Sequence, residues 1–239
     1  MHIKRLHTCC TLLKERPTNL KGKKHSSQLW LTRQLKDPYV EKAKKENYRC
    51  RSAFKLLEIN ERHNILSPGM IVIDCGAAPG SWTQVAVKLT NSNGSQENKP
   101  IGSVFSIDRQ LFHQVEGAHI LGNSDFTSLE THRKLRDLLN GKLVDLVMSD
   151  MAPNASGVRD IDHEVIITLA YSALKFALQF SKPGSTFLTK IWDGGKSSQL
   201  EEDLCKFYNK VKVVRPDATR DDSHEMYFLA REFKGLKAG

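Results

Sequence analysis

The sequence has few cysteines, and none of them form the closely spaced pairs of a zinc site. The five cysteines are Cys9, Cys10, Cys50, Cys75 and Cys205. Structural zinc sites use CxxC-type pairs, and disulfide frameworks use an even number of cysteines. The pattern therefore indicates neither kind of site and favours a reducing compartment. We expect no bound metal.

Long apolar runs are also absent. No stretch approaches the roughly 18 to 20 apolar residues that cross a bilayer, so we expect a protein that is soluble or peripheral, with no membrane partner. The first 25 residues contain seven Lys and Arg residues and a single acid, Glu15, but no apolar signal-peptide core. This composition is typical of an organellar transit peptide. A basic disordered arm is the alternative interpretation of residues 1–25.

Positive charge is concentrated near the N-terminus. The formal net charge is +9, and residues 1–60 hold 15 of the 36 Lys and Arg residues but 5 of the 27 Asp and Glu residues, which leaves 21 against 22 in the rest. Basic side chains bind phosphates by releasing counterions. We therefore predict an RNA-contacting segment over residues 26–60, with a catalytic domain over residues 61–239. The predicted phosphate contacts are Lys42, Lys44, Lys45, Arg49 and Arg51; a solvated helix face is the alternative for each lysine.

Short β-branched runs alternate with longer helical patterns from Ile71 onward, which predicts a parallel sheet covered by helices on both faces. The predicted strands are Ile71 to Asp74, Val104 to Asp108, His119 to Leu121, Val144 to Ser149, Thr186 to Ile191, Val211 to Val214 and Met226 to Ala230. The predicted helices are Trp82 to Leu89, Ser128 to Leu139, Glu164 to Phe180 and Ser197 to Lys210. Only polar, turn-rich residues separate the last two strands, so we expect them to pair antiparallel. A seven-stranded, mostly parallel α/β sheet with an antiparallel last strand is the layout of class I methyltransferases.

The segment Val72 to Trp82 (VIDCGAAPGSW) combines an apolar strand with a glycine-containing turn that leads into a helix. Open α/β sheets bind ligands at such strand ends. A GxGxxG fingerprint is absent, which favours a ligand without a pyrophosphate, such as S-adenosylmethionine, over NAD. Carboxylates near three consecutive strand ends suit its ammonium, ribose and adenine groups, although a turn or N-cap role is the alternative for Asp108 and Asp125. The predicted cofactor-binding residues are Asp74, Gly76, Ala77, Ala78, Pro79, Gly80, Ser81, Trp82, Asp108, Asp125 and Asp150. For Trp82, a place in the core is an equal alternative.

Charged residues also mark the ends of three later strands. Asp150 follows the fourth strand, Lys190 ends the fifth and Glu225 opens the seventh. A lysine at the end of an apolar strand is costly to bury unless an acid pairs with it. If the three strand ends converge, two acids flank one buried amine, and Lys55 on a basic helix before the sheet supplies a second cation.

At the motifs SAFKL, DCGAAPGSW, SDMAPNASG, FLTKIW and SHEMYFLA, the chain resembles the RrmJ/FtsJ-type ribose 2′-O-methyltransferases over roughly residues 29–232. The resemblance places that family's Lys-Asp-Lys-Glu tetrad on Lys55, Asp150, Lys190 and Glu225, with Lys190 as proton acceptor. One departure is Ser81, where many members have a second glycine; the start of a helix should tolerate it. The basic leader and the segment LWLTRQLKDPYV resemble mitochondrial members.

The resemblance implies S-adenosylmethionine-dependent 2′-O-methylation of large-subunit ribosomal RNA, at a uridine, in the mitochondrial matrix. The partner would be this RNA or a pre-ribosomal particle, and we expect a monomer. Two alternatives stay open: a transfer-RNA ribose methyltransferase of the same family, and a non-catalytic RNA-binding assembly factor. The intact tetrad argues against the second alternative.

The sequence leaves the protonation state of Lys190 open. A lysine with a reference pKa of about 10.4 is protonated at neutral pH and must lose a proton before it can act as a base. Burial beside Lys55 would lower the pKa of Lys190, whereas Asp150 and Glu225 would raise it. A proton that leaves only as the hydroxyl attacks is equally consistent.

Overall fold

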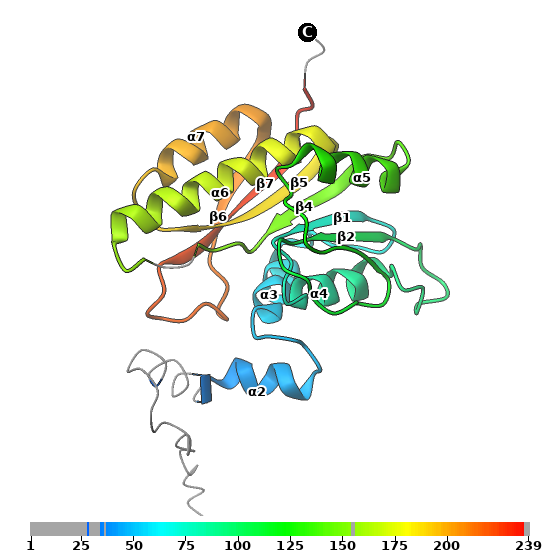
Figure 1. Cartoon of the computed structure of the whole chain (residues 1–239), viewed down its shortest axis with the longest axis horizontal. Coiled ribbons are helices and arrows are strands. Elements are labelled where there is room, and N and C mark those ends of the chain that lie inside the picture. Colours follow the sequence, from blue (N-terminus) through cyan, green and yellow to red (C-terminus); the bar gives the residue numbers. More distant parts are fainter. Residues whose placement is uncertain (1–27, 29–33, 36, 154–155, 237–239) are drawn as a thin grey trace, which may run out of the picture.

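The computed structural model describes residue 28 and residues 34–35, 37–153 and 156–236 (Figure 1). The predicted transit segment, residues 1–25, lies outside the described residues. No helix in the described part of the chain is long and apolar enough to cross a membrane.

A seven-stranded sheet forms the centre of the fold, in the order β3-β2-β1-β4-β5-β7-β6. Neighbouring strands are parallel from β3 through β5, and β7 pairs antiparallel with both β5 and β6. This arrangement confirms the predicted layout with an antiparallel last strand. The strands are β1 Ile71–Cys75, β2 Ser103–Ile107, β3 Ala118–Leu121, β4 Val144–Ser149, β5 Ser181–Trp192, β6 Tyr208–Val214 and β7 Glu225–Phe233.

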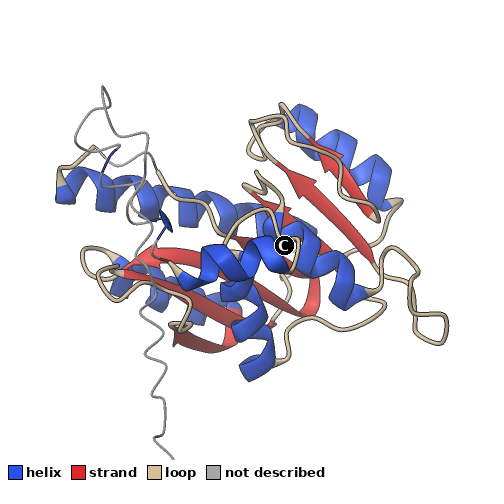
Figure 2. Cartoon of the chain, turned by 90° about the horizontal axis from the view of Figure 1, so that it is seen from below, coloured by secondary structure: helices blue, strands red, loops and turns tan. Residues whose placement is uncertain are grey.

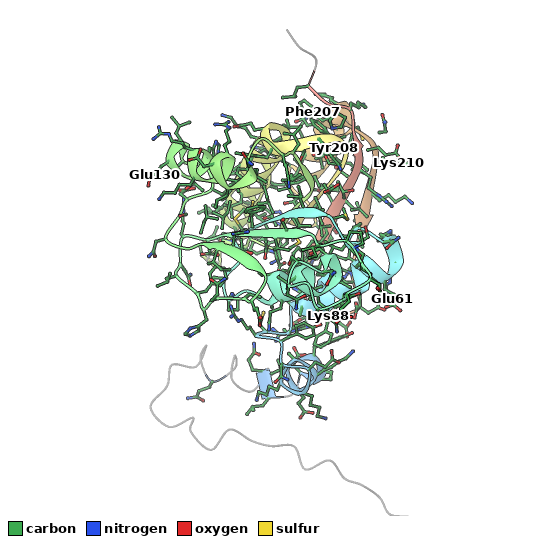
Figure 3. All side chains as sticks on the ribbon, turned by 90° about the vertical axis from the view of Figure 1, so that its right-hand side faces the viewer. Glu61, Lys88, Glu130, Phe207, Tyr208 and Lys210 are labelled. Atoms are coloured by element: carbon green, nitrogen blue, oxygen red, sulfur yellow. The ribbon has the colours of Figure 1, made fainter. Side chains whose placement is uncertain are left out.

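Helices cover both faces of the sheet, and each face has its own apolar core (Figures 1 and 2). One face packs against α3 Ala53–His63 and α4 Ser81–Thr90, and the other against α5 Leu129–Leu139, α6 Arg159–Phe180 and α7 Ser197–Phe207. In Figure 3, Lys88 and Glu61 mark the first face, whereas Glu130 and Phe207 mark the second. The helix α2 Pro38–Lys45 lies outside the layers of sheet and covering helices, next to α3 (Figure 1).

Several boundaries in the structure differ from the sequence-based ones, and α6 begins at Arg159, five residues before the predicted start at Glu164. The helix α7 ends at Phe207, and the next residues already belong to β6, whereas the predicted helix ran to Lys210. The strand β5 begins at Ser181, five residues earlier than predicted, because a register shift against β4 accommodates Pro183 and Gly184 within it. The predicted domain boundary at residues 60–61 falls inside α3, whose buried residues belong to the core of the first face, so the folded body already includes this helix.

Candidate active site

Three neighbouring strands bring the predicted catalytic residues to one edge of the sheet. Asp150 directly follows β4, Lys190 lies near the end of β5 opposite Tyr227, and Glu225 is the first residue of β7, opposite Trp192. Lys55 reaches the same place from the first turns of α3. The predicted convergence of the strand ends is therefore confirmed.

Four ionisable side chains form one continuous cluster, which we call the tetrad. The Nζ atom of Lys190 lies 2.9 Å from Oδ1 of Asp150 and 3.6 Å from Oε2 of Glu225, and it also donates to the backbone carbonyl of Asp150 at 2.7 Å. The Nζ atom of Lys55 lies 2.5 Å from Oε1 of Glu225. Acids thus alternate with amines, and the Lys190 side chain is only 7% exposed.

The two acids of the tetrad raise the pKa of Lys190 above its ordinary value. Burial alone would lower this pKa, but the negative charges of Asp150 and Glu225, together with the hydrogen bond to Asp150, outweigh it. Asp150 is affected in the complementary way: burial would raise its pKa, yet the charges of Lys190 and Lys55 hold it below the usual range. In the resting protein, Lys190 is therefore an ammonium paired with a carboxylate.

Tyr227 is a fifth member of this site that the sequence analysis missed. Its hydroxyl lies 2.7 Å from Oδ1 of Asp150 and 3.1 Å from Oε1 of Glu225, so its single proton can be donated to either acid. Burial next to these acids raises its pKa well above the usual range. The available signal was the alternation of β7: two residues after Glu225, a side chain points to the same face of the strand.

The predicted cofactor turn joins β1 to α4, and its backbone is held from two sides. Gly76 and Gly80 both have positive φ, and a Cβ at Gly76 would lie 2.1 Å from Cγ of Met151. The amide of Ala78 donates to Asp108 at 2.8 Å, and those of Gly76 and Ala77 donate to the carbonyl of Ile107. Glycine is therefore required where the turn approaches the segment after β4.

A cavity of about 490 Å³ borders this turn. It is lined by Arg49, Ala78, Pro79, Gln110, Leu111, Phe112 and His113. Its size falls within the range of small-molecule sites, which is roughly 300 to 1,000 Å³. The turn that the sequence singled out thus has open space beside it.

Two of the predicted cofactor carboxylates, Asp74 and Asp108, lie in different surroundings. Asp74 is fully buried, accepts a hydrogen bond from Thr83 at 2.8 Å, and has a pKa raised to about 7, chiefly by burial. Asp108 accepts from the amides of Ala78 and Gln110. Asp108 therefore lies beside the turn, whereas Asp74 supports α4 from behind it.

Asp125 follows β3 and accepts hydrogen bonds from Thr127 and Arg109. These bonds lower its pKa, although partial burial alone would raise it. The N-cap of α5 is Ser128, which accepts from the amide of Thr131. The N-cap role considered for Asp125 is thus taken by another residue.

Ser81 and Trp82 begin α4 and are both buried. The hydroxyl of Ser81 lies 2.8 Å from that of Ser52, so serine in place of glycine is accommodated at the helix start, as predicted. The indole of Trp82 donates to the carbonyl of Ser52 and packs against Tyr227. The side chain of Trp82 is therefore a core residue that links α3, α4 and β7.

The predicted RNA-contacting residues divide into two groups. Arg49 donates to the carbonyls of Pro79, His113 and Gln114, so its guanidinium supports the rim of the cavity beside the β1–α4 turn. Lys42 lies 4.5 Å from the ring centre of Phe54. Lys44 and Lys45 are exposed on α2 and have no ion-pair partner in the described part of the chain. The two lysines thus remain available to phosphates.

Arg51 belongs to a second buried charge cluster, which we call the Asp37 cluster. Oδ2 of Asp37 lies 2.6 Å from Arg51 and 3.0 Å from Arg220, and Oδ1 accepts from the amide of Tyr39, which caps α2. Arg51 also donates to the carbonyl of Ala218. This cluster fastens α2 and the start of α3 to the loop that leads into β7.

A family comparison covers most of the folded body. Residues 48–233 match the model of the FtsJ-like methyltransferase family. Among curated proteins, the chain is 57% identical over 222 residues to "rRNA methyltransferase 2, mitochondrial" of Drosophila melanogaster, covering 93% of this chain and 89% of that protein. The predicted likeness to this mitochondrial member is confirmed.

Bacterial relatives and a solved structure agree with this assignment. The chain is 44% identical over 223 residues to "Ribosomal RNA large subunit methyltransferase E" of Cereibacter sphaeroides, covering 93% of this chain and 91% of that protein. A crystal structure described as a ribosomal RNA methyltransferase of Plasmodium falciparum superposes with a TM-score of 0.69 at 24% identity, covering 79% of this chain and all of that one. The last likeness bears on the fold alone.

Proposed function

Because this chain belongs to the FtsJ-like methyltransferase family, we propose that it transfers a methyl group from S-adenosylmethionine to the 2′-hydroxyl of a ribose in large-subunit ribosomal RNA. The observation that carries the proposal is the tetrad, in which the Lys190 ammonium lies between two carboxylates at the sheet edge. The names of the relatives support the RNA substrate.

The residues around the β1–α4 turn fit the proposed cofactor. The cavity beside Ala78 and Pro79 adjoins Asp108, whose carboxylate is suited to ribose hydroxyls, and Asp125 is suited to the adenine amino group. Glycine at position 80 leaves room for the Arg49 guanidinium at the edge of this cavity, since a Cβ there would lie 2.5 Å from it. When bound, the cofactor supplies an electrophilic methyl group on a sulfonium.

Lys190 first acts by positioning the hydroxyl. Its ammonium has three N–H groups, of which two are used at short range on Asp150. The contact with Glu225, at 3.6 Å, is longer than a normal hydrogen bond. The third N–H is therefore the one that a ribose 2′-oxygen would accept, which holds this oxygen in place for attack.

Lys190 then acts as proton acceptor by relay. Its raised pKa means that it holds its full set of protons at rest. An Nζ proton first moves to Oδ1 of Asp150, 2.9 Å away, which leaves Lys190 a neutral amine; rotation about the Cε–Nζ bond turns its lone pair towards the hydroxyl, and Nζ accepts the hydroxyl proton as the oxygen bonds to the methyl carbon. Lys55 and Tyr227 hold the two acids in position.

We further propose a uridine target and action in the mitochondrial matrix. The mitochondrial relative at 57% identity and the basic composition of residues 1–25 support this compartment. The substrate would be the ribosomal RNA or a pre-ribosomal particle, bound by α2 through Lys44 and Lys45. No group of three metal-ligating side chains occurs among the described residues.

A methyl-transfer assay with labelled S-adenosylmethionine tests the proposal. Purified large-subunit ribosomal RNA, transfer RNA and buffer alone are compared, and the product is digested to locate the label on a 2′-oxygen. We expect label in ribosomal RNA only. Label in transfer RNA would favour the transfer-RNA enzyme, and RNA binding without any transfer would favour the assembly factor.

A further inference from the structure

A second cavity lies beside the tetrad, on the α6 side of the strand ends. It has a volume of about 380 Å³, and its lining includes Arg159, Asp162, His163, Trp192, Ser223 and His224. The residues come from the start of α6, the end of β5 and the turn before β7. None of them belongs to the tetrad or to the cofactor turn.

The cavity and the tetrad share the same strand ends. Trp192 lies opposite Glu225 in the pairing of β5 with β7 and two residues beyond Lys190. The amide of Glu225 donates to the hydroxyl of Ser223 at 3.2 Å, and the amide of Asp193 donates to the carbonyl of His224 at 2.8 Å. The cavity and the tetrad therefore adjoin the same ends of β5 and β7, with Trp192 packed on the α6 side and Lys55 reaching the tetrad from α3.

The lining offers an aromatic platform. Trp192 is partly exposed, and its ring meets that of His163 at a centroid distance of 6.1 Å and an angle of 77°. His224 adds an exposed imidazole. Indole and imidazole rings are the side chains on which proteins stack splayed-out RNA bases.

The polar groups of the lining suit an uncharged heterocycle with an adjacent phosphate. The Nδ1 atom of His163 is buried without a partner among the described residues, so no protein contact fixes which ring nitrogen carries the proton, and the ring is able to donate or accept. Asp162 is already engaged by the amides of Ser156 and Gly157. Arg159 is exposed and has no ion-pair partner in the described part of the chain, which suits a phosphate at the entrance.

We propose that this cavity, which we call the base cavity, holds the nucleobase of the nucleotide whose ribose is methylated, stacked on Trp192, with Arg159 facing a neighbouring phosphate. The inference rests on the proposed function. The base is attached to the ribose carbon next to the one that bears the 2′-hydroxyl. In any RNA bound with its ribose at Lys190, this base lies nearer to the reacting hydroxyl than a flanking base does, so we infer it as the occupant of the cavity at the same strand ends.

A double-mutant cycle between protein and RNA tests the base cavity. The methylated nucleotide is mapped first, and an RNA fragment is then made with an abasic ribose at that position. Trp192→Ala should lower kcat/KM on the normal fragment about 10- to 100-fold, because the base loses the ring on which it stacks. The abasic fragment should lower kcat/KM of the parent protein by a similar factor, because the same stacking contact is lost. The combination should be no worse than either change alone.

Two milder variants test the base cavity even if Trp192→Ala does not fold. His224→Ala and Arg159→Gln change exposed side chains. They should raise KM for RNA several-fold while the affinity for S-adenosylmethionine, measured by calorimetry, stays that of the parent. Arg133→Gln on the exposed side of α5 is the matched control and should change neither quantity.

Three outcomes would overturn the inference. One is that the abasic and Trp192→Ala effects multiply; a second is that His224→Ala and Arg159→Gln behave like Arg133→Gln. The third is that Trp192→Ala abolishes the effect of an abasic site at a flanking nucleotide, and not the effect of one at the methylated nucleotide. If the parent methylates no RNA, the proposed function fails, and the same cycle is run on the affinity for normal and abasic oligoribonucleotides by fluorescence anisotropy.

Discussion

The tetrad and the Asp37 cluster are two buried groups of opposite charges, and they are built from different cations. The tetrad places the amines of Lys55 and Lys190 between two acids. The Asp37 cluster places the guanidiniums of Arg51 and Arg220 around one acid. Both connect the N-terminal segment to the approach of β7. The tetrad links α3 to the strand that carries Glu225, whereas the Asp37 cluster links α2 to the loop before that strand.

The kind of cation indicates the role of each cluster: amines suit proton transfer, and guanidiniums suit a structural attachment. An amine is a compact point charge whose pKa responds to its neighbours, so it can hand a proton on during a reaction. A guanidinium stays charged in proteins and binds carboxylates through a planar fork, which fixes geometry without exchanging protons. We therefore expect changes in the tetrad to reduce the rate of methyl transfer, and changes in the Asp37 cluster to affect folding and RNA binding.

The largest expected effect is that of Lys190→Ala on the chemical step. The loss of a proton acceptor should lower kcat about 10²- to 10⁴-fold, and the loss of positioning would add to this. Lys190→Arg should fail nearly as badly, because the guanidinium keeps its protons. Single-turnover methyl transfer at saturating cofactor measures the rate, and calorimetry checks cofactor binding. A Lys190→Ala protein within tenfold of the parent rate would remove Lys190 from the chemistry.

A smaller, different effect is expected from Asp37→Asn. The two arginines would lose their shared counter-charge, which should lower the free energy of unfolding by about 1 to 3 kcal/mol. KM for RNA should rise because α2 is less firmly held, while kcat at saturating RNA should stay that of the parent. Urea unfolding and steady-state kinetics measure these quantities.

The matched control for Asp37→Asn is Asp217→Asn in the same loop before β7. Asp217 pairs with Arg62 at the surface, where both side chains are well exposed. Such a pair contributes about 0 to 1 kcal/mol, so this variant should resemble the parent. If both variants lowered the free energy of unfolding equally, the buried Asp37 cluster would contribute no more to stability than a surface ion pair, which would contradict the prediction.

The last expected effect is confined to a pH dependence and concerns Asp74, a buried acid with a hydroxyl partner, Thr83, in place of a cation. Its pKa is raised to about 7 in the folded protein, from an ordinary value near 3.8. Between these two values the folded state binds more protons than the unfolded state, so stability falls as pH rises from about 4 to about 7. Above pH 7 this contribution no longer changes.

Asp74→Asn should remove that dependence. The free energy of unfolding of the parent, taken relative to that of the variant, should decrease by up to about 1.4 kcal/mol for each pH unit between 4 and 7. Urea unfolding at several pH values measures the difference. A difference that is constant from pH 5 to pH 8 would show that Asp74 titrates normally, and that burial without a cation does not hold its proton.

Local patterns in the amino-acid sequence predicted much of the fold. Short β-branched runs and the polar segment 215–224 were enough to predict seven strands and an antiparallel end, because a short polar connection cannot make a parallel crossover. Strand limits were less accurate around Pro183 and Gly184. The sequence shows a turn signal there, whereas the register shift that includes both residues in β5 depends on pairing with β4.

The candidate site divides in the same way. Residue types and motif order in the sequence alone identified Lys55, Asp150, Lys190 and Glu225, since charged residues at the ends of apolar strands need partners. The tertiary structure decided three further matters: the direction of the Lys190 pKa, the part played by Tyr227, and the use of Arg49 and Arg51 inside the protein. Each depends on distances between side chains far apart in the chain, and both electrostatic energy and hydrogen bonding change steeply with distance and burial, which no local pattern encodes.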